Sequence, residues 1–138
     1  MSNKKSGGCL CGAIRYEVSS PTDKIVQCHC RNCQKISGAG ASANILVDTD
    51  KFKYTSGEPK VFVDTGDSGV QLNRAFCGNC GSSLFSQRHN MMNKLVLKAG
   101  SLDDSSDAKV VMNIWRQSAR PWVLTDPEVS TFDQNRPT

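Results

Sequence analysis

Seven cysteines in three close groups are the residues of this sequence best suited to chemistry. They form a C-x-C, a C-x-C-x-x-C and a C-x-x-C motif, which lie at Cys9 and Cys11; Cys28, Cys30 and Cys33; and Cys77 and Cys80. Thiolates at such spacings are typical zinc ligands, because Zn²⁺ accepts four sulfurs in a tetrahedron. The odd number of cysteines also argues against a closed set of disulfides. Isolated buried thiols or a redox-active C-x-x-C are the competing interpretations, but three grouped motifs together favour metal binding.

The spacing inside each group gives a geometric reason for metal binding. In an extended strand, residues i and i+2 point to the same face, so Cys9 and Cys11 are expected to reach one ion. The same reasoning applies to Cys28 and Cys30. The motif at 77–80 instead predicts a tight turn, since the Gly and Asn between its cysteines tolerate positive φ.

Seven ligands divide most simply into a set of four and a set of three. The central motif at 28–33 is compact enough to bind one ion alone. The first and last motifs, at 9–11 and 77–80, then remain to form a four-thiolate site. Four thiolates make a closed structural zinc site, whereas three leave a coordination position open for water or a substrate thiol.

Spacing alone leaves another grouping open. Cys30 and Cys33 could join the motif at 77–80 in one ribbon-like site, and the other three cysteines would then have no metal. His29 is a further candidate ligand inside the central motif. If Cys28 and Cys30 share a strand face, however, His29 points away from the ion.

The elements that position these motifs are predicted to be short strands. Apolar residues at 14, 16 and 18 alternate with charged residues at 15 and 17, which is typical of a half-buried strand. Further strands are expected at 25–30, 43–47, 52–55, 60–64, 70–76, 83–86, 95–99 and 110–115. The best helix candidate is a short turn that follows Cys30 and extends towards Ser37. We therefore predict an all-β fold in a single zinc-binding domain over 1–138, with its core at about 5–132.

Composition excludes several classes of protein. The chain has 138 residues and a net charge of +4, with 17 basic and 13 acidic residues scattered along it. No basic stripe predicts a nucleic-acid partner, and no apolar run predicts a signal peptide or a membrane span. We expect a cytoplasmic protein, because clustered cysteines in a reducing compartment more often indicate metal chemistry than disulfides.

Three segments around the cysteines closely resemble the glutathione-dependent formaldehyde-activating enzyme family, which also includes centromere protein V. They are GGCLCGAIRY at 7–16, CHCRNCQK at 28–35 and RAFCGNCGS at 74–82. The similarity continues through NIW at 113–115 and ARPW at 119–122. It covers roughly residues 5 to 132, and the order and spacing of the cysteines are its most specific part.

The resemblance implies an all-β fold of stacked antiparallel sheets in a tent-like arrangement. It implies two Zn²⁺ per chain: a structural zinc at Cys9, Cys11, Cys77 and Cys80, and a catalytic zinc at Cys28, Cys30 and Cys33. It also implies a carbon–sulfur lyase that joins glutathione, or a similar small thiol, to formaldehyde or another aldehyde. In such an enzyme, the substrate thiol would take the open position on the three-cysteine zinc.

The sequence assigns functional roles less clearly to residues other than cysteine. Glutathione carries two carboxylates, and the cations available for them are Arg74, Arg88, Lys98 and Arg116. Candidates for proton transfer near the central motif are His29, Arg31 and Lys35. All of these residue types are also common on solvated strand faces.

Two other functions are compatible with the same motifs. The first is a zinc-binding module without catalysis, either a carrier of glutathione or another thiol, or a protein-interaction domain. The second is a zinc-containing methionine sulfoxide reductase, which needs a cysteine outside the metal sites. The division into four and three ligands leaves no such cysteine, so it favours the lyase.

Overall fold

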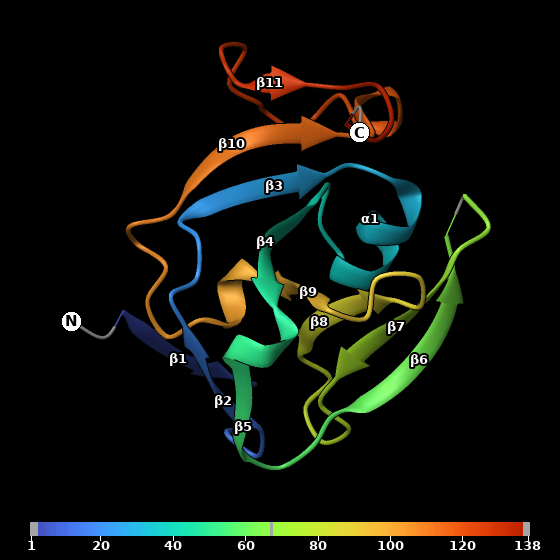
Figure 1. Ribbon diagram of the computed structural model, residues 1–138. Helices are drawn as coiled ribbons and strands as arrows, with labels where there is room; N and C mark the ends of the chain where they lie inside the picture. The colour runs from blue at the N-terminus through green and yellow to red at the C-terminus, as the bar shows by residue number, and fades with distance from the viewer. Residues whose placement is uncertain (1–2, 67, 137–138) are drawn as a thin grey trace.

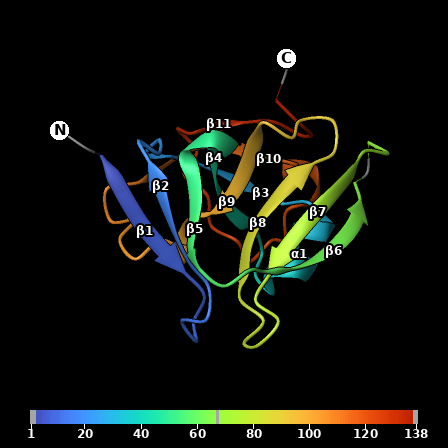
Figure 2. The same cartoon turned by 60° about the horizontal axis from the view of Figure 1, so that its bottom comes forward.

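The computed structural model describes residues 3–66 and 68–136, whose strands form two sheets. The smaller sheet is antiparallel and has the order β1-β2-β5. Its strands are β1 (Lys4–Gly8), β2 (Arg15–Ser19) and β5 (Phe52–Ser56). Figure 2 shows this sheet on one side of the molecule, with the connection from β5 to β6 crossing to the other.

The larger sheet has eight strands in the order β11-β10-β3-β4-β9-β8-β7-β6. Their bounds in that order are Ser130–Thr131, Lys109–Ile114, Lys24–Cys28, Ser42–Asp48, Lys94–Lys98, Ser83–Arg88, Gln71–Phe76 and Lys60–Thr65. Most neighbours are antiparallel, but β10 runs parallel to both β3 and β11. Figure 1 shows the sheet curving around α1.

Helical structure is confined to short segments. The helix α1 (Arg31–Ser37) ends at Gly38, which takes the left-handed conformation that glycine adopts without strain. The other helical segments among the described residues are three single turns of 3₁₀ helix, η1 (Thr49–Lys51), η2 (Ala99–Ser101) and η3 (Arg116–Ser118). None of the helices in the described part of the chain is long and apolar enough to cross a membrane.

The hydrophobic core lies between the small sheet and one face of the large sheet. Tyr16 and Val18 of β2 contribute from one side, and Ile45 and Leu97 of β4 and β9 from the other. The Tyr16 ring packs against Phe52, with 4.9 Å between ring centroids. Because side chains alternate along each strand, the residues next to Ile45 and Leu97 point to the opposite face of the large sheet.

The predicted fold class is confirmed, because the chain forms stacked and mainly antiparallel sheets. A strand occurs in each of the nine predicted regions, and α1 begins directly after Cys30. Two strands have no counterpart in the prediction. β1, with the sequence KKSGG, lacks alternating apolar residues, and β11 has only two residues. Both owe their conformation to backbone pairing with a neighbour, which a single-sequence pattern does not record.

Candidate metal centres and pocket

Four cysteines from the two ends of the cysteine pattern converge between the sheets. The sulfurs of Cys9, Cys11, Cys77 and Cys80 all lie within 4.8 Å of one another. Two of the separations are 3.6 Å, from Cys9 to Cys11, and 3.8 Å, from Cys11 to Cys77. Sulfurs around a tetrahedral zinc are about 3.8 Å apart at the usual Zn–S distance, so the donor set fits this ion.

Backbone and side-chain donors point at these sulfurs. The N–H of Ile14 donates to Cys9 Sγ at 3.2 Å, and this hydrogen bond lowers the pKa of the Cys9 thiol. The Asn79 amide donates to Cys11 Sγ at 3.2 Å. A hydrogen bond to the Ser82 hydroxyl is the main cause that lowers the pKa of Cys80 to about 5. The surroundings of Cys9 and Cys80 therefore favour the thiolate, the form that binds metal, whereas the pKa of Cys77 is raised, with burial and its Cys80 and Cys9 neighbours among the causes that raise it.

The local reason predicted for the C-x-C pairs is wrong. Cys9 and Cys11 do not lie on a strand but in the turn between β1 and β2, where Gly12 N–H donates to Cys9 O at 3.2 Å. Gly12 has φ of 80°, and this turn, not strand alternation, brings the two sulfurs together. The motif at 77–80 forms the expected tight turn, in which Gly81 N–H donates to Cys77 O at 2.8 Å.

The remaining three cysteines form a second cluster where β3 meets α1. Cys28 is the last residue of β3, Cys30 is the N-cap of α1, and Cys33 lies in its first turn. Their sulfurs also lie within 4.8 Å of one another. The Cys33 N–H donates to Cys30 Sγ at 3.3 Å, so a helix cap rather than a shared strand face orients Cys30.

Electrostatics shows that this three-sulfur cluster suits a cation. Hydrogen bonds from Cys28 and Cys30 lower the pKa of the Cys33 thiol to about 2. Hydrogen bonds that the protonated Cys28 thiol makes with Cys30 and Cys33 raise the pKa of Cys28, and burial and the charge of the neighbouring thiolates raise it further. One thiolate therefore forms readily while full ionisation needs compensating charge, which a divalent ion such as Zn²⁺ provides.

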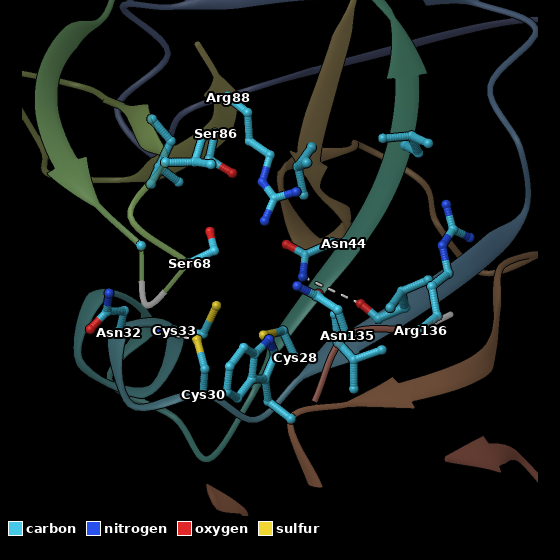
Figure 3. Close-up of a pocket in the computed structure, with 18 of the residues that line it drawn as sticks. Cys28, Cys30, Asn32, Cys33, Asn44, Ser68, Ser86, Arg88, Asn135 and Arg136 are labelled. Carbon is cyan, nitrogen blue, oxygen red and sulfur yellow. Dashed lines mark hydrogen bonds between the residues drawn. The ribbon is translucent and has the colours of Figure 1, made fainter. Parts of the chain in front are cut away.

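The three-sulfur cluster opens onto a pocket of about 300 Å³ on the face of the large sheet opposite the core. Cys28, Cys30 and Cys33 all line this pocket, and none of the other four cysteines, all in the described ranges, does so. Figure 3 shows the three cysteines at one side of the pocket, with Ser86 and Arg88 across from them. The cluster of four sulfurs and the cluster of three thus have different surroundings.

Positive charge gathers around the pocket. Four basic residues line it, and no Asp or Glu in the described ranges does; they are Arg74, Arg88, Lys98 and Arg136. Lys98 Nζ donates to Asn44 Oδ1 at 2.8 Å, and burial lowers the pKa of Lys98 although the nearby Cys33 thiolate raises it. Arg74 Nε donates to Asp64 Oδ2 at 2.7 Å behind the pocket wall.

The remaining predicted residues lie elsewhere. Arg116 is exposed in η3 and does not line the pocket, unlike the other three predicted cations. His29 belongs to neither sulfur cluster; it is buried, with its Nε2 2.9 Å from Asn113 Oδ1. Arg31 is hydrogen-bonded to Gln34, and Lys35 is exposed on α1. Neither is a pocket residue.

Sequence reasoning missed several residues of the pocket. Asn44 and Ser86 face it from alternate positions of β4 and β8, and Asn135 and Arg136 approach from the end of the described chain. Strand alternation could have identified Asn44 as a residue facing away from Ile45. Nothing in the sequence pattern predicts that Asn135 and Arg136 fold back over the same pocket.

Comparison with known proteins identifies a family for most of the chain. The sequence model of the glutathione-dependent formaldehyde-activating enzymes matches residues 4–118. The chain belongs to this family. The matched range contains all seven cysteines and every strand of both sheets except β11. The resemblance drawn from the cysteine segments is thereby confirmed.

The individual proteins that match share low sequence identity with this chain. A Halomonas elongata protein, provisionally named a glutathione-dependent formaldehyde-activating enzyme, is 32% identical over 83 residues, or 57% of this chain. The aligned part spans about half of that relative, 53% of its length. A crystal structure of a Rhodobacter sphaeroides protein has a TM-score of 0.57 and 15% identity, and the alignment covers 92% of this chain and 98% of that one. This similarity shows a shared fold.

The ion pair behind the pocket gives the first testable prediction. The Arg74 side chain is only 9% exposed and its partner Asp64 22%, so Asp64→Asn leaves a largely buried guanidinium without its carboxylate. We expect a loss of about 2–3 kcal/mol in the free energy of unfolding, measured with denaturant. Glu17→Gln, which breaks the exposed pair with Lys4, is the control and should cost under about 0.5 kcal/mol. Equal losses in the two variants would contradict the prediction.

Proposed function

We propose that this protein is a zinc-dependent carbon–sulfur lyase of the S-(hydroxymethyl)glutathione synthase type. In the synthetic direction, the thiol of glutathione loses its proton and its sulfur forms a bond to the carbonyl carbon of formaldehyde. The carbonyl oxygen takes up a proton, so the reaction needs no oxidant or reductant. The reverse reaction breaks the same carbon–sulfur bond.

The observation that carries the proposal is the opening of the three-sulfur cluster onto the pocket. We assign Cys28, Cys30 and Cys33 as ligands of a catalytic zinc, and Cys9, Cys11, Cys77 and Cys80 as ligands of a structural zinc. A zinc ion held by three thiolates supplies an open coordination position that favours the thiolate form of a substrate. The closed set of four offers no such position.

The basic residues of the pocket suit an anionic thiol. Lys98 stands near the sulfur cluster, where its charge offsets the negative charge that another thiolate would add. Arg88 takes part in no ion pair or side-chain hydrogen bond within residues 3–66 and 68–136, and it lines the pocket across from the cysteines. We assign Arg88 to a carboxylate of glutathione.

The proposal extends to the organisation and location of the protein. We treat 1–138 as one zinc-binding domain, because the large sheet collects strands from residue 24 to residue 131. All seven cysteines are free thiols in the structure, and metal binding would require them to remain reduced. A reducing cytoplasm with glutathione meets both needs.

Paired cysteine variants test the two metal sites. Cys30→Ser removes a ligand beside the pocket and should abolish formation of S-(hydroxymethyl)glutathione while a cooperative thermal transition remains. Cys77→Ser removes a ligand between the sheets and should lose that transition, because a structural zinc contributes directly to folding. Zinc per chain, melting and adduct formation are measured together. Cys30→Ser should lose one of about two bound zinc ions, whereas the unfolded Cys77→Ser variant should lose both.

Two results would contradict these assignments. Identical behaviour of the Cys30 and Cys77 variants would show that the sites do not differ in role. Glutathione binding without adduct formation in the zinc-loaded protein would favour a thiol carrier over a lyase.

A charge variant tests how the thiol is recognised. Arg88→Met should raise KM for glutathione about tenfold with a smaller change in kcat, because a charge-assisted hydrogen bond to a carboxylate is lost. Arg116→Met, which removes the same charge outside the pocket, is the control and should leave both constants within about twofold. A KM that responds to neither substitution, or equally to both, would argue against the role of Arg88.

A further inference from the structure

One wall of the pocket is apolar and lies beside the sulfur cluster. Five residues make up this apolar strip, which is formed by Val26, Leu46, Val96, Met112 and Ile114. They come from β3, β4, β9 and β10. The basic residues Arg74 and Arg88 lie on β7 and β8, and Lys98 lies on β9 at the border of the strip. The pocket therefore offers both basic and apolar side chains, and an occupant that matches both is amphipathic.

Strand register places the strip residues in two cross-strand pairs that meet diagonally, because the direct partner of Val26 on β4 is Asn44, two residues before Leu46. Met112 is the direct cross-strand partner of Val26, and Leu46 is the partner of Val96. Ile114 is paired with Cys28, so the strip begins at the sulfur cluster itself. Cross-strand partners lie about 5 Å apart, close enough for one alkyl chain to contact several of them.

The strip is not needed by the hydrophobic core. On β4 and β9 the alternate residues, Ile45, Leu95 and Leu97, fill the core with 3% exposure or less. Leu46, between Ile45 and Val47, is 42% exposed, and Val26, Val96, Met112 and Ile114 are all only partly buried. Apolar side chains gathered in a concave site point to a ligand that covers them.

Glutathione and formaldehyde would leave most of the apolar strip uncovered. The tripeptide is polar along its length and carries two carboxylates, and the carbon that formaldehyde adds is a single hydroxymethyl group. Neither supplies the several methylene groups that would cover five apolar side chains. A carbonyl compound with an apolar substituent would supply them, and would place them next to the reacting sulfur.

We propose that the carbonyl substrate carries an apolar substituent of several carbons, which lies on the apolar strip. This inference rests on the proposed lyase function and narrows its substrate class. The thiol sulfur bonds to the carbonyl carbon, the thiol proton is released, and the carbonyl oxygen takes up a proton, as with formaldehyde. The substituent stays on that carbon in the resulting hemithioacetal.

Binding of two stable thioethers to the zinc-loaded protein tests the inference. S-hexylglutathione and S-methylglutathione both lack a free thiol, so they differ only in five methylene groups. Full burial strengthens binding about fourfold per methylene, and half burial of the chain gives about 30-fold tighter binding of the hexyl compound. Isothermal titration calorimetry should also show a more negative heat capacity change for the hexyl compound.

Substitutions in the apolar strip test whether the hexyl group binds there. Leu46→Asn and Met112→Asn should reduce the preference for the hexyl compound to about threefold or less. Val111→Asn is the matched control, because Val111 is also half-exposed on β10 but does not line the pocket. It should keep the preference within about twofold of the original protein. Melting of each variant checks that the fold is retained.

The outcomes separate the inference from the proposed function. Equal binding of the two thioethers, no binding of either, or a preference that survives both strip variants overturns the inference. Formation of S-(hydroxymethyl)glutathione, measured on the same preparation, tests the lyase independently. The lyase can therefore stand while the inference fails, and a hexyl preference without any adduct formation overturns the lyase but leaves an apolar binding site.

Discussion

The crowding of sulfur atoms is the constraint on which the rest of this molecule depends. Seven thiols are gathered into two clusters whose members lie within 4.8 Å of one another, and thiolates at such distances repel strongly unless a cation lies among them. The four-sulfur cluster joins the turn after β1 to the turn after β7, so it connects the small sheet to the large one. These four cysteines thus lie at the junction between the two layers of the core.

Because side chains alternate along its strands, the large sheet places core residues on one face and pocket residues on the other. Residues such as Ile45 and Leu97 pack against the small sheet, whereas Asn44 and Lys98, their neighbours in sequence, face the pocket. The same hydrogen-bonded strands therefore hold the pocket side chains in a fixed register. Side chains on a hydrogen-bonded sheet of this kind are positioned more precisely than side chains on loops.

Much of the fold could be predicted because apolar alternation at positions such as 14, 16 and 18 follows directly from burial of one strand face. The two cysteine clusters were also foreseeable, but the reason given for the C-x-C spacing was not correct. Gly12 and a helix cap at Cys30 create those geometries, and each depends on local backbone conformation. Arg88 and Arg116 could not be told apart in sequence, because strand order alone brings Arg88 to the pocket.

Trp115 illustrates how the pocket depends on distant parts of the chain. It follows β10 in a left-handed conformation, with φ of 57°, which costs a bulky residue about 1–3 kcal/mol. Its N–H donates to Gln134 O at 3.0 Å, and the neighbouring Asn135 and Arg136 line the pocket together with Trp115. The strained turn thus directs β10 towards the terminal segment just where Ile114 pairs with Cys28. A pocket completed in this way needs tertiary contacts between residues about 20 apart, and these contacts maintain a conformation that local preference opposes.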